Sequence, residues 1–536
     1  MRLILNLSCR TLLLELEVSM FAIALALLMV LSACSSAPTG PAAARALIDE
    51  SAMAMGGWAA LDSVKSQEII TGGGDVEPLQ AVDPAGDPRV INQFGQSIVA
   101  DFEKNRMRLS FDAIREYPSR QPVKFVEVID GDAGMLETPP ANGNSTRERL
   151  HPSRYATRLR DMRRLPIRIL YTAKNATDLS REPDKVDGKV TMNILHFKDG
   201  GQPVELQLDS FNKLPLRVIY TEDDPIYGDT LNEVAFFDWR DYSGIRLPQT
   251  EATFLNGNKI REEHVRTLIN NPKYEDSSLT VPPEIRSQPE VGERIVSQWP
   301  LRRIVMGVNY LDFAREQKVE LIEAGKGIYH VKGSDHHSMA VEMKDYIVMV
   351  EAPFFEERSI AVMKAVEDKI PGKPVKYLVL THFHIDHTGG MRAYAAKGAT
   401  IVVQENMVPF VKTALSRPKT MRPDTLAKAG NITPNIEGFK DVKPITDGER
   451  TIELREIANP HSTGMLVVYL PKEKMLFESD LFTPGTPVDP ANTLGVQNAA
   501  ALLTGITTMN IQVDRIVGGH GDIAPLRDLA KIGRNQ

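Results

Sequence analysis

The chain has 536 residues, a net charge of −7 and only two cysteines, Cys9 and Cys34. An acidic chain of this kind binds nucleic-acid phosphates poorly, so we expect no nucleic-acid partner. The length leaves room for two or three hydrophobic cores, since a domain takes about 100–250 residues. Both cysteines precede residue 35, so a metal site elsewhere in the sequence has to use other ligands.

The N-terminal segment predicts export. Residues 20–33 form an uncharged apolar stretch of 14 residues. This stretch is too short to span a bilayer comfortably, but it suits the core of a signal peptide. A core helix or a plain transmembrane anchor is the alternative interpretation.

The apolar stretch ends in Leu31-Ser-Ala-Cys34, which resembles a bacterial lipobox. The resemblance implies that Cys34 is lipidated and becomes the mature N-terminus, and that Ser35 directs the protein to the outer membrane. We therefore expect a signal peptide over residues 1–33 and a tether over 34–44. The expected location is the bacterial cell envelope, as an outer-membrane lipoprotein that faces the periplasm and meets the membrane through its lipid anchor.

Residues 45–285 predict a β-rich domain. Short alternating runs at 204–208 and 216–220 are typical of strands, and Asn256-Gly257 between two such runs predicts a tight hairpin. Turn residues separate the runs, which favours an antiparallel sheet with a few helices.

This part of the chain weakly resembles the periplasmic lipoprotein-carrier class. The similarity lies in Gly56-Gly57 and in the segments 61–67, 209–215 and 239–248. It implies a half-open sheet that holds an acyl chain. A β-rich spacer or a substrate-presenting domain is the alternative.

A cluster of arginines follows in the same region: Arg154, Arg158, Arg160, Arg163, Arg164 and Arg168. Their irregular spacing would wrap around a helix and would not form one stripe. We expect a solvated basic helix or loop, with a patch for anionic lipid or substrate as the alternative.

The strongest functional pattern is Thr-His-Phe-His-Ile-Asp-His-Thr-Gly-Gly at residues 381–390. The apolar run at 375–381 predicts a buried strand, and residues 391–397 predict a helix. The pattern therefore lies on a strand-to-helix loop, where layered α/β folds build their sites. Imidazole and carboxylate are ligands that zinc prefers. The metal-capable side chains are His382, His384, Asp386 and His387.

Three further candidates, His461, Asp480 and His520, each lie at or near the end of a strand-like stretch. With residues 381–390 in this order, residues 316–536 resemble the metallo-β-lactamase superfamily. The resemblance implies an αβ/βα sandwich and two metal sites. His382, His384 and His461 would hold one metal, and Asp386, His387 and His520 the other. Asp480 would bridge both metals together with a water or hydroxide, and Asp386 would also orient the nucleophile.

Of the remaining histidines, His336 and His337 stand out because in the resembled fold the loop before this early strand faces the metal site. We expect one of the pair to contact substrate and neither to be a metal ligand. Other histidines, among them His330, are expected to be ordinary core or surface residues.

The predicted fold class is α+β, with a β-rich antiparallel domain, a linker over 286–315 and a metallo-β-lactamase sandwich. The predicted function is a zinc-dependent hydrolase with two Zn²⁺ ions. Their bridging hydroxide would attack an ester, lactone, thioester or related bond of a small-molecule substrate. The absence of a cysteine ligand favours the thioesterase, lactonase and phosphodiesterase branches. The alternatives are a persulfide dioxygenase with one Fe²⁺, and a lipid carrier whose metal domain is vestigial.

Overall fold

The computed structural model describes residues 39–140, 145–297 and 317–531. The predicted signal peptide, Cys34 and part of the predicted linker lie outside these ranges, and the domain boundaries stay a prediction. Within the ranges, no helix is both long enough and apolar enough to span a bilayer.

The N-terminal part, which we call the front domain, is built on one antiparallel sheet of thirteen strands in the described residues. Most strands pair with their neighbours in sequence, and β1 pairs with β13, so that the order is β6-β5-β4-β3-β2-β1-β13-β12-β11-β10-β9-β8-β7. The strands are β1 (Ser66–Glu77), β2 (Arg89–Asp101), β3 (Arg106–Arg115), β4 (Gln121–Asp130), β5 (Ala133–Thr138), β6 (Thr146–Arg149), β7 (Ser180–Asp187), β8 (Val190–Asp199), β9 (Gln202–Asp209), β10 (Pro215–Asp224), β11 (Gly228–Tyr242), β12 (Ile245–Leu255) and β13 (Asn258–Asn270).

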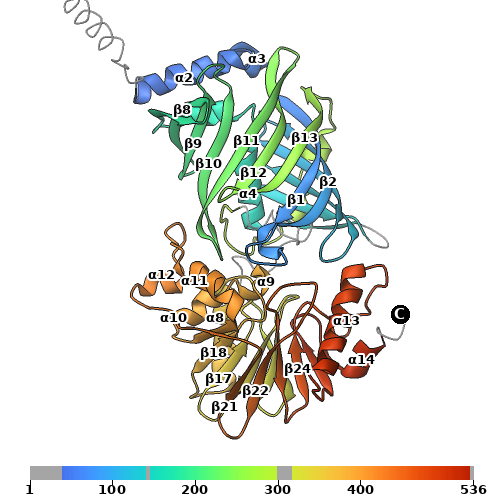
Figure 1. The fold of residues 1–536 in the computed structure, drawn as a ribbon. Helices are drawn as coiled ribbons and strands as arrows, with labels where there is room; N and C mark the ends of the chain where they lie inside the picture. The colour runs from blue at the N-terminus through green and yellow to red at the C-terminus, as the bar shows by residue number, and fades with distance from the viewer. Residues whose placement is uncertain (1–38, 141–144, 298–316, 532–536) are drawn as a thin grey trace, which may run out of the picture.

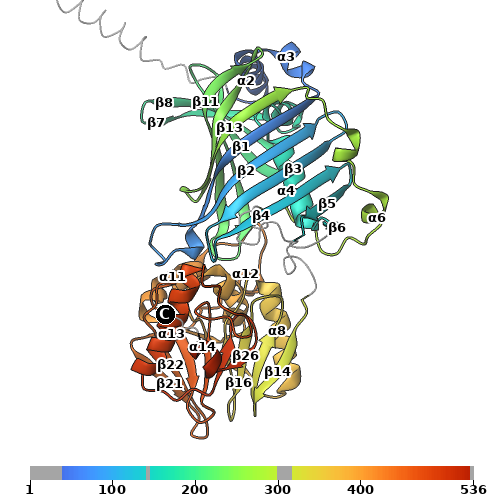
Figure 2. The same cartoon turned by 90° about the vertical axis from the view of Figure 1, so that its right-hand side faces the viewer.

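This sheet is strongly curved, and α4 lies in its hollow (Figures 1 and 2). The helical elements of the front domain are α2 (Pro41–Ala54), α3 (Trp58–Ser63), η1 (Pro78–Gln80), α4 (Pro152–Arg163), α5 (Ile169–Asn175), η2 (Asp276–Leu279) and α6 (Pro283–Arg286). The predicted hairpin is confirmed: Asn256 and Gly257 connect β12 to β13 with φ of 48° and 82°, a conformation that favours this residue pair.

The prediction of a solvated arginine cluster is wrong. Arg154 and Arg160 on α4 are buried, because the helix is enclosed by the sheet. Arg154 pairs with Glu127 and Arg160 with Glu222, so each buried guanidinium has a carboxylate that offsets its desolvation. The sequence could not show this because the carboxylates lie on distant strands.

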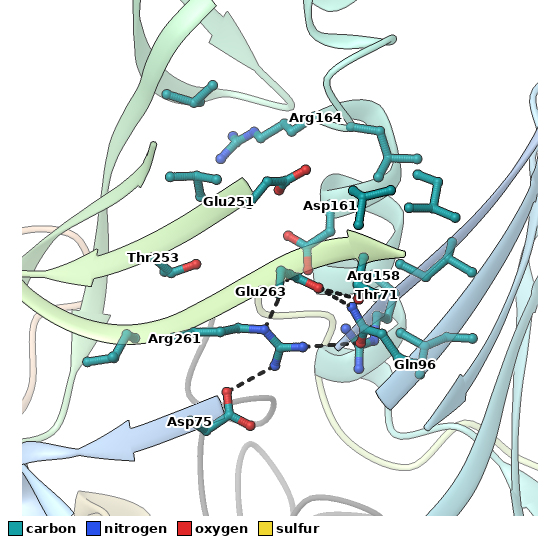
Figure 3. Close-up of a pocket in the computed structure, with 18 of the residues that line it drawn as sticks. Thr71, Asp75, Gln96, Arg158, Asp161, Arg164, Glu251, Thr253, Arg261 and Glu263 are labelled. Atoms are coloured by element: carbon teal, nitrogen blue, oxygen red, sulfur yellow. Dashed lines mark hydrogen bonds and ion pairs between the residues drawn. The ribbon is translucent and has the colours of Figure 1, made fainter. Parts of the chain in front are cut away.

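A cavity of about 180 Å³ separates α4 from the inner face of the sheet (Figure 3). Arg261 lies beside it and donates to Asp75 and to Gln96, both at 3.1 Å, while Gln96 donates to Glu263 at 2.7 Å. Burial, reinforced by the nearby Glu263 carboxylate, raises the pKa of Glu251 to about 8. The hollow of the sheet therefore holds charged side chains among apolar ones and differs from a purely apolar acyl-chain pocket.

The C-terminal part, which we call the metal domain, contains two sheets in the described residues. The first has the order β14-β15-β16-β17-β18-β19-β20 and the second β21-β22-β23-β24-β25-β26. The strands are β14 (Glu320–Gly325), β15 (Ile328–Lys332), β16 (Ser338–Glu342), β17 (Ile347–Val350), β18 (Val375–Val379), β19 (Thr400–Gln404), β20 (Ile436–Phe439), β21 (Val442–Thr446), β22 (Thr451–Glu456), β23 (Leu466–Leu470), β24 (Met475–Glu478), β25 (Arg515–Gly518) and β26 (Ile523–Pro525).

Helices cover the outer face of each sheet, so the layers run helix, sheet, sheet, helix (Figure 1). Strand β17 shows why: Ile347 and Met349 face the helices, while Val348 and Val350 face the other sheet. This arrangement confirms the predicted α+β fold class. The helical elements are α8 (Glu356–Lys369), α9 (Ile385–Thr388), α10 (Met391–Ala396), η3 (Glu405–Met407), α11 (Val408–Ser416), α12 (Thr425–Ala429), α13 (Thr493–Thr508) and α14 (Leu526–Ala530).

The front domain and the metal domain share part of one apolar core. Leu79 and Ala81 of the β1–β2 loop and Ile226 of the β10–β11 turn belong to the core cluster that lies between the first sheet and its helices. An ion pair supports the contact near Ile226: Lys419 of the metal domain pairs with Asp223 of β10 at 2.5 Å. The two parts of the chain are therefore packed together at the end of the front sheet that faces α9 (Figure 1).

We expect Ile226→Ala to lower the free energy of unfolding by about 2–5 kcal/mol, because Ile226 is buried in the core cluster of the metal domain. Chemical denaturation of the full chain measures this change. Phe211→Ala, in another hairpin turn but 95% exposed, is the control and should shift stability by no more than about 0.5 kcal/mol. Equal stability of both variants would contradict the shared core.

Candidate metal centre

The segment formed by the β18–α9 loop and α9 carries the first cluster of candidate ligands. His382 and His384 lie in the loop, Asp386 and His387 lie in α9, and all four are buried. The strand β18 and the helix α10, which flank this segment, match the elements predicted from sequence.

The other candidates come from the second sheet. His461 lies between β22 and β23, Asp480 follows β24, and His520 follows β25. The structure brings all seven predicted residues together, in two groups whose ligand atoms lie within 4.8 Å of one another. The first group is His382, His384, His461 and Asp480, and the second group is His336, Asp386, His387 and His520.

Asp480 connects the two groups. Its Oδ2 lies 2.9 Å from His461 Nε2 and 3.3 Å from His382 Nε2, in the first group. Its Oδ1 lies 2.7 Å from His520 Nε2 and 3.1 Å from His387 Nε2, in the second group. Asp480 has a φ of 63°, which is uncommon for a residue other than glycine and is a form of strain that clusters at functional sites.

The protonation state of two imidazoles, those of His382 and His384, suits metal binding. Burial lowers the pKa of His382 to about 4 and holds that of His384 well below its usual range. Both rings are therefore neutral near pH 7, the form that binds metals. Burial would also lower the pKa of His387, but Asp480, Glu351 and Asp386 together raise it well above its usual range.

Two observations indicate that divalent cations fit these groups. The Nε2 atoms of His382 and His387 are buried, and although they lie 3.3 Å and 3.1 Å from Asp480 oxygens, neither makes an aligned hydrogen bond to a described residue, whereas such atoms normally do. Three carboxylates, those of Glu351, Asp386 and Asp480, are buried around them. The imidazole nitrogens and carboxylate oxygens offer suitable ligands, and cations would balance the negative charge.

The two histidines expected near the substrate occupy different places. His336 Nε2 lies 3.1 Å from Asp386 Oδ2, and its ring stands 4.1 Å from that of His520, so His336 is a member of the second group. His337 is in neither group; its backbone N–H donates to Gly519 O at 2.8 Å, next to His520. Their predicted contact with substrate stays a prediction, and His336 is also a candidate ligand that the sequence did not suggest.

Glu351 is a further residue of the site, and no expectation from the sequence included it. It follows β17, is completely buried, and its Oε2 accepts a hydrogen bond from His387 Nδ1 at 2.6 Å. This contact fixes the ring so that Nε2 faces Asp480. A signal was available, because a carboxylate directly after the apolar run 347–350 is unusual.

The front domain also supports the site, which was not expected from the sequence. Gln80 Nε2 donates to Asp386 Oδ1 at 2.6 Å, and His384 Nε2 donates to the carbonyl oxygen of Ala81 at 2.8 Å. The second bond leaves His384 Nδ1 to face the first group, 3.1 Å from His461 Nε2. Neither group contains a front-domain residue in the described ranges, but the β1–β2 loop orients members of both. No sequence pattern marks this loop.

We expect Glu351→Gln to weaken metal binding roughly 10- to 100-fold, because the variant loses the negative charge that orients His387. Competition with a chromophoric chelator measures the affinity. Glu478→Gln is the control: Glu478 is equally buried, but its Oε2 accepts from the backbone amides of Leu481 and Phe482. Unchanged metal affinity in Glu351→Gln would show that this carboxylate does not support the site.

Comparison with curated proteins gives one short match. A stretch of 73 residues is 37% identical to the linear primary-alkylsulfatase of a Pseudomonas species. The match covers 13% of this chain and 11% of that protein, so the chain spans only a small part of the length of this relative.

Comparison with solved structures gives metallo-β-lactamases. One from Pontibacter korlensis has a TM-score of 0.31 and 19% identity, over 41% of this chain and all of that one. FIM-1 from Pseudomonas aeruginosa, in its mono-zinc form, has a TM-score of 0.30 and 16% identity, over 40% of this chain and 93% of that one.

The family model of the metallo-β-lactamase superfamily matches residues 315–520. The matched region contains both sheets and their covering helices except β26 and α14, and it contains every member of both candidate ligand groups. The metal domain of this chain belongs to the metallo-β-lactamase superfamily.

Proposed function

We propose that the protein is a hydrolase that uses two metal ions, most simply Zn²⁺, to cleave an ester, lactone, thioester or related bond in a small molecule. The observation that carries this proposal is the position of Asp480, whose two oxygens face different ligand groups. A single-iron dioxygenase would need only one such group. The short match to an alkylsulfatase adds sulfate esters to the candidate substrates.

The chain's own residues prepare the site for hydrolysis. Two bound divalent ions would lower the pKa of a shared water and polarise the bond to be cleaved. Asp386 is held from two sides, by Gln80 at Oδ1 and by His336 at Oδ2, so its carboxylate has a fixed direction for orienting a nucleophile. His382 and His384 stay neutral because they are buried, and no proton has to leave them before a metal binds.

We expect two zinc ions per chain in the purified full-length protein, because the two groups together offer eight ligand residues. Elemental analysis measures the content. A panel of carboxylic ester, lactone, thioester, β-lactam, phosphodiester and alkyl sulfate substrates then identifies the bond. One iron and no zinc would reject the hydrolase in favour of the dioxygenase, and a protein without metal would favour the vestigial carrier.

We expect Asp480→Asn to reduce turnover about 10²- to 10³-fold and to weaken binding of one metal. The change keeps the shape of the side chain but removes the charge that faces both groups. Turnover, metal content and thermal stability are measured together, and stability should change little. Asp514→Asn, at an exposed position directly before β25, is the control. Full activity with two metals in Asp480→Asn would reject the bridging role.

We also propose that the mature protein is an outer-membrane lipoprotein anchored through a lipid on Cys34. The hydrolase would then lie in the periplasm. Two or more acyl chains anchor a protein stably, since each buried CH₂ contributes about 0.8 kcal/mol. We expect Cys34→Ala to leave the precursor unprocessed or to release the protein from the membrane fraction. Cell fractionation and mass spectrometry of the N-terminus measure this, and unchanged processing would contradict the assignment.

A further inference from the structure

Two front-domain side chains reach the first group. Tyr117, in the turn between β3 and β4, is buried, and its hydroxyl lies 3.4 Å from His461 Nε2. Arg89, at the start of β2, donates from Nη2 to the carbonyl oxygen of His461 at 2.9 Å. Both belong to the front domain, yet they converge on one residue of the metal domain.

The nitrogen that Tyr117 approaches is the one that faces the first group. His461 Nε2 also lies 2.9 Å from Asp480 Oδ2 and 3.1 Å from His384 Nδ1. An imidazole nitrogen that binds a metal has neither a proton nor a lone pair left for a hydroxyl group. The Tyr117 hydroxyl would then keep its proton beside the reaction site, and an oxygen atom of a substrate is a suitable acceptor.

Arg89 places a fixed positive charge beside the side chain of Tyr117. Its guanidinium carbon lies 4.3 Å from the centre of the Tyr117 ring, and its bond to His461 holds the group in place. A guanidinium keeps its charge at all relevant pH values and matches the geometry of oxygen anions. A phenol hydroxyl with a guanidinium beside it suits an oxygen that carries negative charge better than a neutral carbonyl oxygen.

We propose that Tyr117 and Arg89 contact the substrate and select esters whose scissile centre carries an anionic oxygen, as a sulfate or phosphate ester does. The inference rests on the proposed hydrolase function. Both domains would then contribute to the active site. The metal domain would hold the ions, and the front domain would recognise the charged part of the substrate.

The test uses the full-length, zinc-loaded protein with inorganic sulfate and inorganic phosphate as probes. Isothermal titration calorimetry gives the dissociation constant of each anion. We expect Tyr117→Phe and Arg89→Gln to weaken the better-bound anion roughly 10- to 100-fold, with metal content unchanged. Arg89→Lys keeps the charge and should lose less. Tyr155→Phe, a buried front-domain tyrosine that bonds to Gly131 O, is the control.

A kinetic comparison separates this inference from the proposed function. We compare kcat/KM for p-nitrophenyl sulfate or phosphate with kcat/KM for p-nitrophenyl acetate. In Tyr117→Phe the ratio of the first to the second should fall roughly 10- to 100-fold, as the anion affinity does. A wild type that hydrolyses nothing would reject the proposed function, and anion binding alone would then decide the inference. Anion affinity that is absent in the wild type or unchanged in both variants would overturn it. Loss of zinc from the variants would also overturn it, because the pair would then only position His461.

Discussion

The carboxylate of Asp480 faces both groups of candidate metal ligands, and the arrangement of the site depends on that contact. Its two oxygens lie within 3.3 Å of four imidazole nitrogens, which come from three separate connections of the metal domain. Oδ1 faces the second group and Oδ2 the first, so the side chain sets how far apart two cations could bind. The backbone at this residue has a φ of 63° and lies two positions after the end of β24, a conformation of the kind that clusters at functional sites.

The buried carboxylates have different neighbours in the two domains. In the hollow of the front sheet, buried carboxylates pair with arginines, as Glu127 does with Arg154 and Asp75 with Arg261. At the metal centre, the neighbours of Asp480 and Asp386 are mainly imidazoles, and burial keeps some of these neutral. A buried charge without a counter-charge is costly. The contrast supports the binding of cations at the metal centre. It also indicates that the α4 arginines stabilise the front domain by pairing with its buried carboxylates.

The shared core gives the front domain a direct influence on the chemistry. Leu79 and Ala81 anchor the β1–β2 loop in the core of the metal domain, and this places Gln80 and the Ala81 carbonyl against Asp386 and His384. Small displacements of that loop would change the direction of groups around the metals, to which both affinity and rate are sensitive. The front domain is thus part of the site's supporting shell and is more than a spacer.

The sequence alone determined the family of the metal domain and the seven residues that converge at its centre. It could do so because His382, His384, Asp386 and His387 lie within six residues of one another, while His461, Asp480 and His520 lie in the connections that follow strands of the second sheet. The hairpin at Asn256 and Gly257 was also readable, since its φ values depend on those two residues. Only the tertiary structure decided the burial of the α4 arginines, the place of His336 in the second group, and the contacts made by Gln80, Ala81, Tyr117 and Arg89. These depend on how the front sheet curves and packs on the metal domain, and contacts between residues some 300 positions apart leave no local pattern in the chain.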